Sequence, residues 1–281
     1  MATPFGPETL KATLGILRNC SLDYGLALAS RIGPELTTKL PSEWISGLSP
    51  DDQTICFRAT LISWAVARLV PKVMQLKVVL ADQKKKHILV SAGTGSGKTL
   101  PMALNMLLDD PARQSITMTL SPLKRLQLSQ LETFNGLFDT CTVVLNEDTP
   151  RDLAWFAKYL WDQARRARGK AVHAIVTTEQ LQKSKAGHMS MIGQLIRNPF
   201  FYRYIARINV DEAHCIHIDG LPHYGMDAFR PAWGRLDEIK ALLPRSTRWS
   251  LFSATFPPHI LDTVQKKLLP SDYEHIHITS N

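Results

Sequence analysis

The stretch HILVSAGTGSGKT, from His87 to Thr99, joins a short apolar run to a glycine-rich loop that ends in lysine and threonine. It nearly matches the phosphate-binding pattern G-x-x-x-x-G-K-[ST], with Ala92 at the position of the first glycine. Gly95 and Gly97 let the backbone curl so that its N–H groups point at phosphate oxygens, and a following helix adds its positive N-terminal end. We therefore expect a strand, a phosphate-binding loop and a helix, in that order.

Apolar runs typical of strands recur along the rest of the chain, with helix-like segments between them. This alternation predicts an α/β fold with a mostly parallel sheet and helices on both faces. One intervening segment, residues 151–168, has the pattern of a single helix. Strands are expected at residues 87–91, 116–120, 141–145, 173–177, 206–210, 249–253 and 275–279.

The first 70 residues are rich in turn-forming residues and predict a partly helical N-terminal extension, followed by a domain over residues 71–281. Residues 51–70 have apolar side chains near helical spacing after an aspartate start. This pattern predicts a helix that ends before Pro71.

The chain has 281 residues and a formal net charge of +8, which favours an acidic partner such as nucleic acid, although solubility alone would also explain it. Its four cysteines are far apart, which indicates neither a disulfide framework nor a cysteine-rich zinc site. We find no secretory signal and no apolar run of membrane-spanning length. We expect an intracellular protein and assign it to the nucleus, although its two short basic runs do not decide between nucleus and cytoplasm.

A second motif, which is acidic, complements the glycine-rich loop. Residues 208–214, INVDEAH, place Asp211 and Glu212 directly after an apolar run. Lys98 would reach the β- and γ-phosphates of a nucleotide, and the Thr99 hydroxyl would bind Mg²⁺. Asp211 would hold the Mg²⁺ through water, Glu212 would polarise the attacking water, and His214 would link the site to a neighbouring surface.

Residues 92–99 fit the form A-x-T-G-x-G-K-T, so this loop resembles that of superfamily 2 helicases. The resemblance implies a RecA-like P-loop domain that binds ATP and Mg²⁺. The loop residues that would hold ATP are Thr94, Gly95, Ser96, Gly97, Lys98 and Thr99.

Further segments resemble the RecQ branch of these helicases. SPLKRLQLSQ, residues 121–130, is similar to a RecQ motif that lies along bound DNA, which implies DNA contacts by Ser121, Pro122 and Gln130. IVTTEQL, residues 175–181, resembles the A-P-E-x-L segment. FSATF, residues 252–256, carries the S-A-T coupling motif, with Ser253 and Thr255.

A loop after the acidic motif, residues 215–236, is similar to the aromatic-rich loop with which RecQ proteins sense single-stranded DNA. The resemblance implies DNA contacts by Tyr224, Phe229, Arg230 and Trp233, although the loop is several residues longer than in the family. Base stacking explains such an aromatic cluster as well as core packing does.

Upstream, Gln75 lies 23 residues before Lys98, the spacing of the adenine-reading glutamine in RecQ proteins. Lys72 stands where the family has an arginine. The resemblance therefore implies that these two residues help to bind ATP.

Superfamily 2 helicases bind ATP between two RecA-like domains, and this sequence shows the motifs of the first one only. We expect the ATP-binding lobe of a RecQ-like 3′–5′ DNA helicase, with a second RecA-like domain in cis if the chain is a fragment. One alternative is a stand-alone ATP- and nucleic-acid-binding module without motor activity. The other is an RNA helicase of the DEAH or DEAD type, which the VDEAH and SAT strings permit and the FRP after the acidic motif does not suit.

Overall fold

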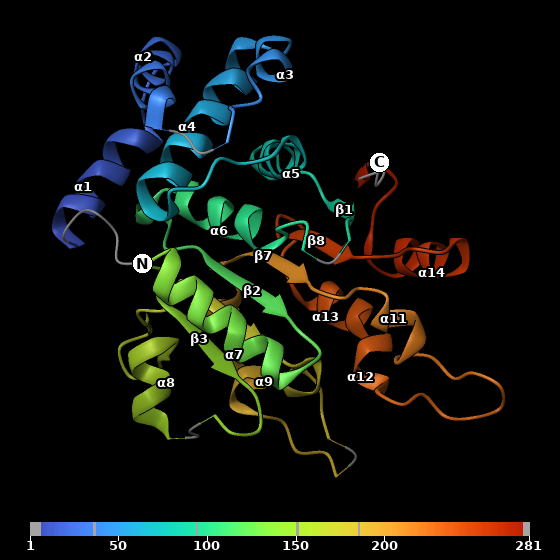
Figure 1. Ribbon diagram of the computed structural model, residues 1–281. Coiled ribbons are helices and arrows are strands. Elements are labelled where there is room, and N and C mark those ends of the chain that lie inside the picture. The colour runs from blue at the N-terminus through green and yellow to red at the C-terminus, as the bar shows by residue number, and fades with distance from the viewer. Residues whose placement is uncertain (1–6, 36–37, 94, 150–151, 185, 278–281) are drawn as a thin grey trace.

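The computed structural model describes residues 7–35, 38–93, 95–149, 152–184 and 186–277. Within these residues, seven strands pair in parallel to form one sheet in the order β3-β6-β2-β7-β8-β1-β9 (Figure 1). The seven predicted strands are all present, and their described ends lie within one residue of the predicted ones; residues 278–279, predicted to end the last strand, lie outside the described residues. Their bounds are β1 Ile88–Ser91, β2 Ile116–Leu120, β3 Thr142–Leu145, β6 His173–Val176, β7 Ile205–Val210, β8 Arg248–Ser253 and β9 Glu274–His277.

Helices cover both faces of this sheet, which confirms the predicted α/β RecA-like fold. One apolar cluster lies under α5 (Val73–Gln83), α6 (Thr99–Leu108) and α7 (Lys124–Glu132). The second cluster lies under α8 (Leu153–Tyr159), α9 (Met191–Leu195), α10 (Pro199–Tyr202), α11 (Cys215–Ile218), α12 (Pro231–Gly234), α13 (Leu236–Leu242) and α14 (Pro258–Leu268). Short 3₁₀ turns cover Gly33–Glu35, Pro111–Arg113 and Thr178–Leu181, and a π turn covers Thr133–Leu137.

The N-terminal segment forms helices that pack above α5 and α6 (Figure 1). They are α1 (Pro7–Arg18), α2 (Leu22–Ile32), α3 (Ser42–Ser46) and α4 (Pro50–Ala67). Helix α4 begins after Ser49, whose hydroxyl accepts the Asp52 N–H at 3.3 Å, and it ends at Arg68 in the left-handed conformation. The helix predicted before Pro71 is therefore confirmed, and its side chains share one apolar cluster with β1. None of the described helices is long and apolar enough to cross a membrane.

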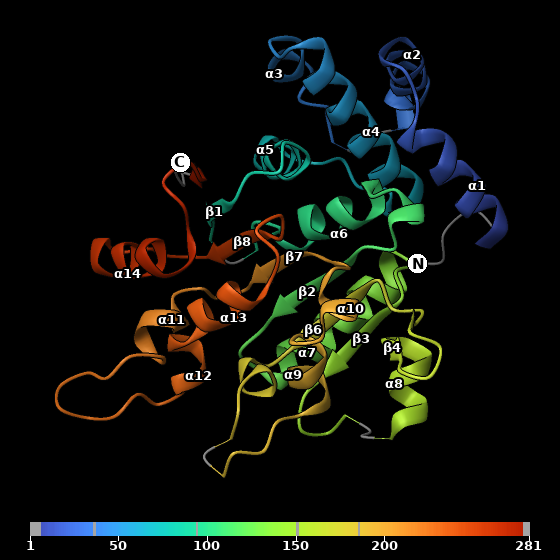
Figure 2. The same ribbon diagram turned by 180° about the vertical axis from the view of Figure 1, so that it is seen from behind.

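The single helix predicted over residues 151–168 is wrong. Helix α8 stops at Tyr159, and an antiparallel hairpin follows, made by β4 (Trp161–Asp162) and β5 (Ala167–Arg168) (Figure 2). The Asp162 carboxylate accepts the N–H groups of Ala164 and Arg165 at 3.0 and 3.1 Å. An aspartate that bonds to the backbone two and three residues ahead stabilises a turn in place of a helix.

Where the strands begin, at the amino edge of the sheet, a buried ionic network joins strands and helices. Arg207, at the start of β7, is fully buried and donates to the Asp82 carboxylate at 2.9 Å and to that of Asp109 at 2.7 Å. Arg248, at the start of β8, donates to Asp82 at 3.0 Å. Because Asp82 ends α5 and Asp109 follows α6, the network fixes the far end of the helix that begins at the phosphate-binding loop.

Candidate nucleotide and nucleic-acid site

The carboxyl ends of β1, β7 and β8 lie side by side, because these strands are neighbours in a parallel sheet. The glycine-rich loop follows β1, the acidic motif follows β7 and the S-A-T segment follows β8. Loops at the carboxyl edge of a parallel sheet are the usual place for ligand sites. Three predicted motifs, far apart in sequence, therefore meet at one edge.

The glycine-rich loop has the curled backbone that phosphate binding requires. Gly95 and Gly97 have φ values of 78° and 82°, a region that favours glycine. The Lys98 ammonium donates to the carbonyl groups of Ala92 at 3.0 Å and Gly93 at 3.3 Å. Thr99 is the first residue of α6, so the N-terminal end of this helix points at the loop. Thr94, also predicted to bind ATP, lies outside the described residues.

Gln75, predicted to read adenine, is buried, and both ends of its amide are engaged within the protein. Its nitrogen donates to the Gly97 carbonyl at 2.9 Å, and its oxygen accepts the Lys72 N–H at 2.7 Å. A Cβ added to Gly97 would lie 2.5 Å from the Gln75 nitrogen, so a side chain there would displace this amide, in addition to the strain at the positive φ. Gln75 thus ties the start of α5 to the phosphate-binding loop, and the adenine-binding role of Gln75 and Lys72 stays a prediction.

The two acidic residues after β7 differ in their surroundings. Asp211 is buried, and its carboxylate accepts the Gln130 side-chain amide at 2.8 Å and the Glu212 N–H at 3.1 Å. Burial raises the pKa of Asp211, and the nearby Glu212 charge adds to this effect, while Lys98 opposes it. Glu212 is partly exposed and has a left-handed φ of 51°. The site therefore holds a concentrated negative charge next to a lysine.

A chain of polar contacts links Glu212 to the S-A-T segment. His214 Nδ1 lies 3.3 Å from the Glu212 carboxylate and 2.9 Å from Ser253 Oγ. Ser253 Oγ donates to the Thr255 carbonyl at 2.9 Å, so it accepts from His214. The three residues predicted to couple the site to a neighbouring surface are thus connected to one another.

The residues present fit ATP and Mg²⁺. Gly95, Gly97, Lys98, Thr99, Asp211 and Glu212 line one hollow together with α7. Two buried polar atoms there, Ser96 Oγ and Gln130 Oε1, have no hydrogen-bond partner among the described residues. Backbone N–H groups, a lysine and a helix N-terminus suit phosphates, while the Thr99 hydroxyl and the Asp211 carboxylate are oxygen ligands suited to Mg²⁺.

The predicted DNA contacts in residues 121–130 are only partly accessible. Ser121 is fully buried at the end of β2, and Pro122 follows it at the carboxyl edge. Gln130 is nearly buried, and its side chain faces Asp211 in the nucleotide hollow. We therefore correct the prediction for Gln130, because its side chain is buried and donates to the acidic motif.

The long loop after α11 is a hairpin that projects from the domain (Figure 1). His223 and Met226 exchange two backbone hydrogen bonds, of 3.2 and 2.9 Å, across Tyr224 and Gly225, which both have positive φ. Positive φ at both central residues is typical of a type I′ turn. The Tyr224 side chain at the tip is 99% exposed, and Phe229 is 82% exposed.

Trp233 differs from the other aromatic residues of this loop. It belongs to α12, and its side chain is fully buried in the second apolar cluster. We therefore correct the prediction that Trp233 stacks on DNA bases: core packing describes this residue, and Tyr224 and Phe229 remain available for stacking.

Arg230 connects the end of the hairpin to two other carboxyl-edge segments. Its guanidinium donates to the Glu179 carboxylate at 2.7 and 2.9 Å and to the Pro122 carbonyl at 2.7 Å. Glu179 lies in the segment resembling A-P-E-x-L, but its partner could not be predicted because a sequence does not show which charges meet. Arg230 thus already has two protein partners, and the DNA contact predicted for it stays a prediction.

The comparisons agree with this geometry. The family model of the DEAD/DEAH box helicases matches residues 72–264. The chain belongs to this family. A curated relative, the ATP-dependent DNA helicase hus2/rqh1 of Schizosaccharomyces pombe, is 26% identical over 166 residues, which cover 59% of this chain and 11% of that protein. The chain thus spans a small part of the curated relative that it matches.

Solved structures of helicases share the fold of this family member. S. cerevisiae Dbp5 bound to RNA and ADP BeF3 is 19% identical, with a TM-score of 0.55 over 83% of this chain and 51% of that chain. A DEAD box protein from Methanococcus jannaschii is 18% identical, with a TM-score of 0.54 over 80% of this chain and 53% of that chain. The DUF1998 helicase MrfA bound to DNA and AMPPNP is 17% identical, with a TM-score of 0.53 over 79% of this chain and 29% of that chain.

Proposed function

We propose that this chain is the ATP-binding lobe of an ATP-driven 3′–5′ DNA helicase related to the RecQ branch. The observation that carries the proposal is the contact chain from Glu212 through His214 and Ser253 to Thr255. It joins the residue proposed to act on water to the S-A-T segment at the end of β8. A DEAD/DEAH box helicase needs such a connection, because nucleotide turnover must change its grip on nucleic acid.

In this proposal the protein residues divide the work at the nucleotide. Lys98 exchanges its carbonyl partners in the loop for phosphate oxygens, because a full negative charge is a stronger acceptor. Glu212 polarises the attacking water, and His214 holds the carboxylate in place through the 3.3 Å contact. Bound Mg²⁺ would neutralise phosphate charge, with Thr99 and Asp211 as the residues that hold it.

A second RecA-like lobe, in cis, would complete the ATP site by supplying arginines to the transferring phosphoryl group. This part of the proposal rests on the resemblance to superfamily 2 helicases. Without such a lobe we expect weak ATP hydrolysis and no strand separation by the 281-residue chain.

The nucleic-acid part of the proposal rests on the exposed aromatic hairpin at the same edge as the nucleotide hollow. Tyr224 and Phe229 offer ring faces on which bases can stack. We favour DNA because Phe229-Arg230-Pro231 follows the acidic motif as in RecQ proteins and because the curated relative is a DNA helicase. RNA is the alternative, since related folds have been solved with either nucleic acid.

The nucleotide site is tested by two substitutions of residues that line the same hollow. Lys98→Ala should weaken ATP–Mg²⁺ binding about 10- to 150-fold, because loss of hydrogen bonds to a charged group costs about 1.5–3 kcal/mol. Glu212→Gln should keep the parent affinity and lose hydrolysis, because the amide cannot take a proton from water. Calorimetry measures the first effect, and phosphate release over long incubations measures the second.

Lys85→Ala serves as the matched control, since this exposed lysine lies on the turn between α5 and β1 and should leave both readouts unchanged. Parent-like ATP affinity in Lys98→Ala would overturn the nucleotide assignment. Tighter binding of the parent chain to an RNA strand than to the DNA strand of the same sequence would favour the RNA alternative.

A further inference from the structure

A basic surface surrounds the β4–β5 hairpin, which replaces the helix that the sequence predicts. The hairpin joins α8 to the start of β6, and α10 ends beside the start of β7, so both lie at the amino edge of the sheet (Figure 2). We call this surface the hairpin patch. Its exposed cationic residues are Lys158, Arg165, Arg166, Lys170 and Arg203.

Contacts hold the members of the hairpin patch together. The Lys170 N–H donates to the Lys158 carbonyl at 3.0 Å, which joins the end of the hairpin to α8. The Arg166 guanidinium lies 5.2 Å from the ring centre of Phe200 in α10. The Arg203 guanidinium lies 4.9 Å from the Tyr204 ring centre and donates to its hydroxyl at 3.0 Å. Cation–π contacts order arginine side chains while their outer N–H groups stay free.

The hairpin patch has little negative charge to balance it. Among the described residues, Asp162 is the one carboxylate in ion-pair contact with these cations, 3.6 Å from Arg165, whose side chain is 85% exposed. The other oxygen of Asp162 accepts two N–H groups of the hairpin turn. Some exposed lysines elsewhere do have close carboxylate partners, such as Lys84 with Asp52 and Lys266 with Asp262, each at 2.8 Å.

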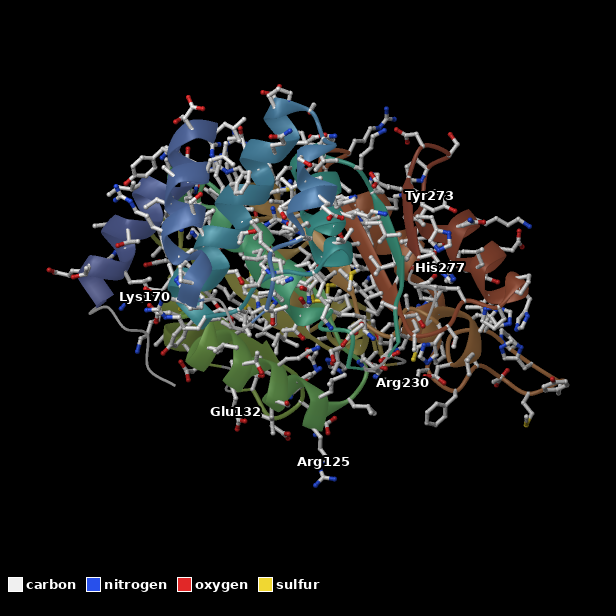
Figure 3. The ribbon with its side chains drawn as sticks, turned by 45° about the horizontal axis from the view of Figure 1, so that its top comes forward. Arg125, Glu132, Lys170, Arg230, Tyr273 and His277 are labelled. Atoms are coloured by element: carbon white, nitrogen blue, oxygen red, sulfur yellow. The ribbon has the colours of Figure 1, made fainter. Side chains whose placement is uncertain are left out.

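We propose that the hairpin patch binds the phosphate backbone of nucleic acid and forms a second contact surface, separate from the carboxyl edge. Figure 3 shows Lys170 and Arg230 on opposite sides of the domain. A nucleic acid that engages both must therefore continue beyond the segment held near the aromatic hairpin. This inference rests on the proposed function, because it assumes that the substrate is nucleic acid. It adds a site on the protein that holds the part of the nucleic acid flanking the segment near the aromatic hairpin.

Nucleic acid fits the hairpin patch better than an acidic polypeptide does. Phosphates are closely and regularly spaced, so one backbone can meet several neighbouring cations. Arginines ordered on aromatic rings match phosphate geometry through two N–H groups each. Exposed Phe200, beside Arg166, also offers a ring edge to a sugar or base.

The test compares two triple variants that remove the same charge from the 281-residue chain. The first combines Arg165→Gln, Arg166→Gln and Lys170→Gln. The control combines Lys84→Gln, Lys85→Gln and Lys86→Gln, at the turn between α5 and β1. The probe is a fluorescein-labelled DNA duplex with a single-stranded 3′ tail, followed by anisotropy at several salt concentrations, and circular dichroism checks folding.

We expect weaker DNA binding and a shallower salt dependence in the hairpin variant only. Each duplex phosphate contact contributes about 0.9 to the magnitude of the slope of log K against log salt concentration. Relative to 1 M salt, one contact therefore contributes about eightfold to the affinity at 0.1 M salt. Two or three lost contacts should therefore weaken binding by about 60- to 500-fold, with ATP affinity unchanged, and this result would support the proposal.

Three results would overturn the proposal. Equal DNA binding by the parent and the hairpin variant would show that the patch does not contact nucleic acid, while the proposed function would stand. Equal weakening in both triple variants would show an effect of net charge alone. Parent-like DNA binding together with loss of poly-glutamate binding in the hairpin variant would assign the patch to an acidic polypeptide. If the parent chain binds no nucleic acid at all, the nucleic-acid part of the proposed function fails with it.

Discussion

The buried ionic network at the amino edge of the sheet and the nucleotide site at its carboxyl edge use charged residues in opposite ways. At the amino edge, Arg207 and Asp82 are fully buried and are bonded to each other and to further partners inside the protein. At the carboxyl edge, Lys98 donates to carbonyl groups of its own loop, and Asp211 lies buried beside another carboxylate. The buried network satisfies its charges internally, and the nucleotide site keeps its charges for ligands.

This difference separates stability from function along the same elements. Strand β7 begins two residues before Arg207 and ends one residue before Asp211, and α6 runs from the phosphate-binding loop to Asp109. Changes in the buried network should therefore reduce folding stability, and changes of exposed side chains at the carboxyl edge should reduce binding with little effect on stability. The three predictions below test this contrast.

The largest effect is expected at Arg207. Arg207→Met should lower the free energy of unfolding by about 3–5 kcal/mol, because it leaves the buried carboxylate of Asp82 without its main partner. Urea denaturation followed by circular dichroism measures this loss. The double variant Arg207→Met/Asp82→Asn should recover part of it, because the unpaired charge is removed. A double variant less stable than the single one would contradict this account.

The second effect concerns His173, the first residue of β6. Burial, with a contribution from Arg207, lowers the pKa of His173 to about 3. The folded state therefore stays unprotonated while the unfolded state binds a proton below about pH 6.5, so stability falls as pH falls between these values. Between pH 7.5 and pH 5 this group alone should remove about 2 kcal/mol of stability.

The measurement is urea denaturation at both pH values for the parent and for His173→Gln, which can keep hydrogen bonds to Thr119 and Thr142. The variant should lose about 2 kcal/mol less than the parent on acidification. Imidazole NMR signals of His173 that titrate near pH 6 in the folded protein would refute the prediction.

The smallest effect is expected at the carboxyl edge. Tyr224→Ala should leave stability unchanged, because this side chain is 99% exposed. It should weaken single-stranded DNA binding by about 1 kcal/mol, or about fivefold, at the low end of base stacking because the site is open to water. Anisotropy with a labelled strand gives the affinity.

Two control variants sharpen this test. Tyr224→Phe should bind like the parent, since the ring is kept, and so should Tyr24→Ala, which removes an exposed tyrosine from α2. If Tyr224→Ala binds DNA as the parent does, the hairpin tip makes no stacking contact.

The sequence predicted the parts of this molecule in which local pattern and tertiary structure agree. Strands such as β1 and β2 are short and buried on both faces, as parallel strands should be, and the loop before Thr99 follows from its glycines. The segment 151–168 was mispredicted because its apolar residues fit a helix, whereas the Asp162 side chain favours a turn.

Contacts between distant residues were beyond what the sequence could give. Trp233 and Tyr224 are both aromatic residues of the segment 215–236, but Trp233 is buried and Tyr224 is exposed. Their difference depends on where α12 packs, which no local pattern encodes. Likewise, the position of Gln130 beside Asp211 depends on how α7 lies across the end of β7.

The left-handed backbone at Glu212 has a consequence for how this domain can change over time. At a φ of 51° a side chain is held at a cost of about 1–2 kcal/mol, which glycine would avoid. Folding by itself therefore favours glycine at position 212, whereas water activation requires the acid. If selection for ATP turnover were relaxed, selection for stability would therefore favour early loss of the carboxylate that we propose to be catalytic, and it would leave an ATP-binding domain that no longer hydrolyses ATP.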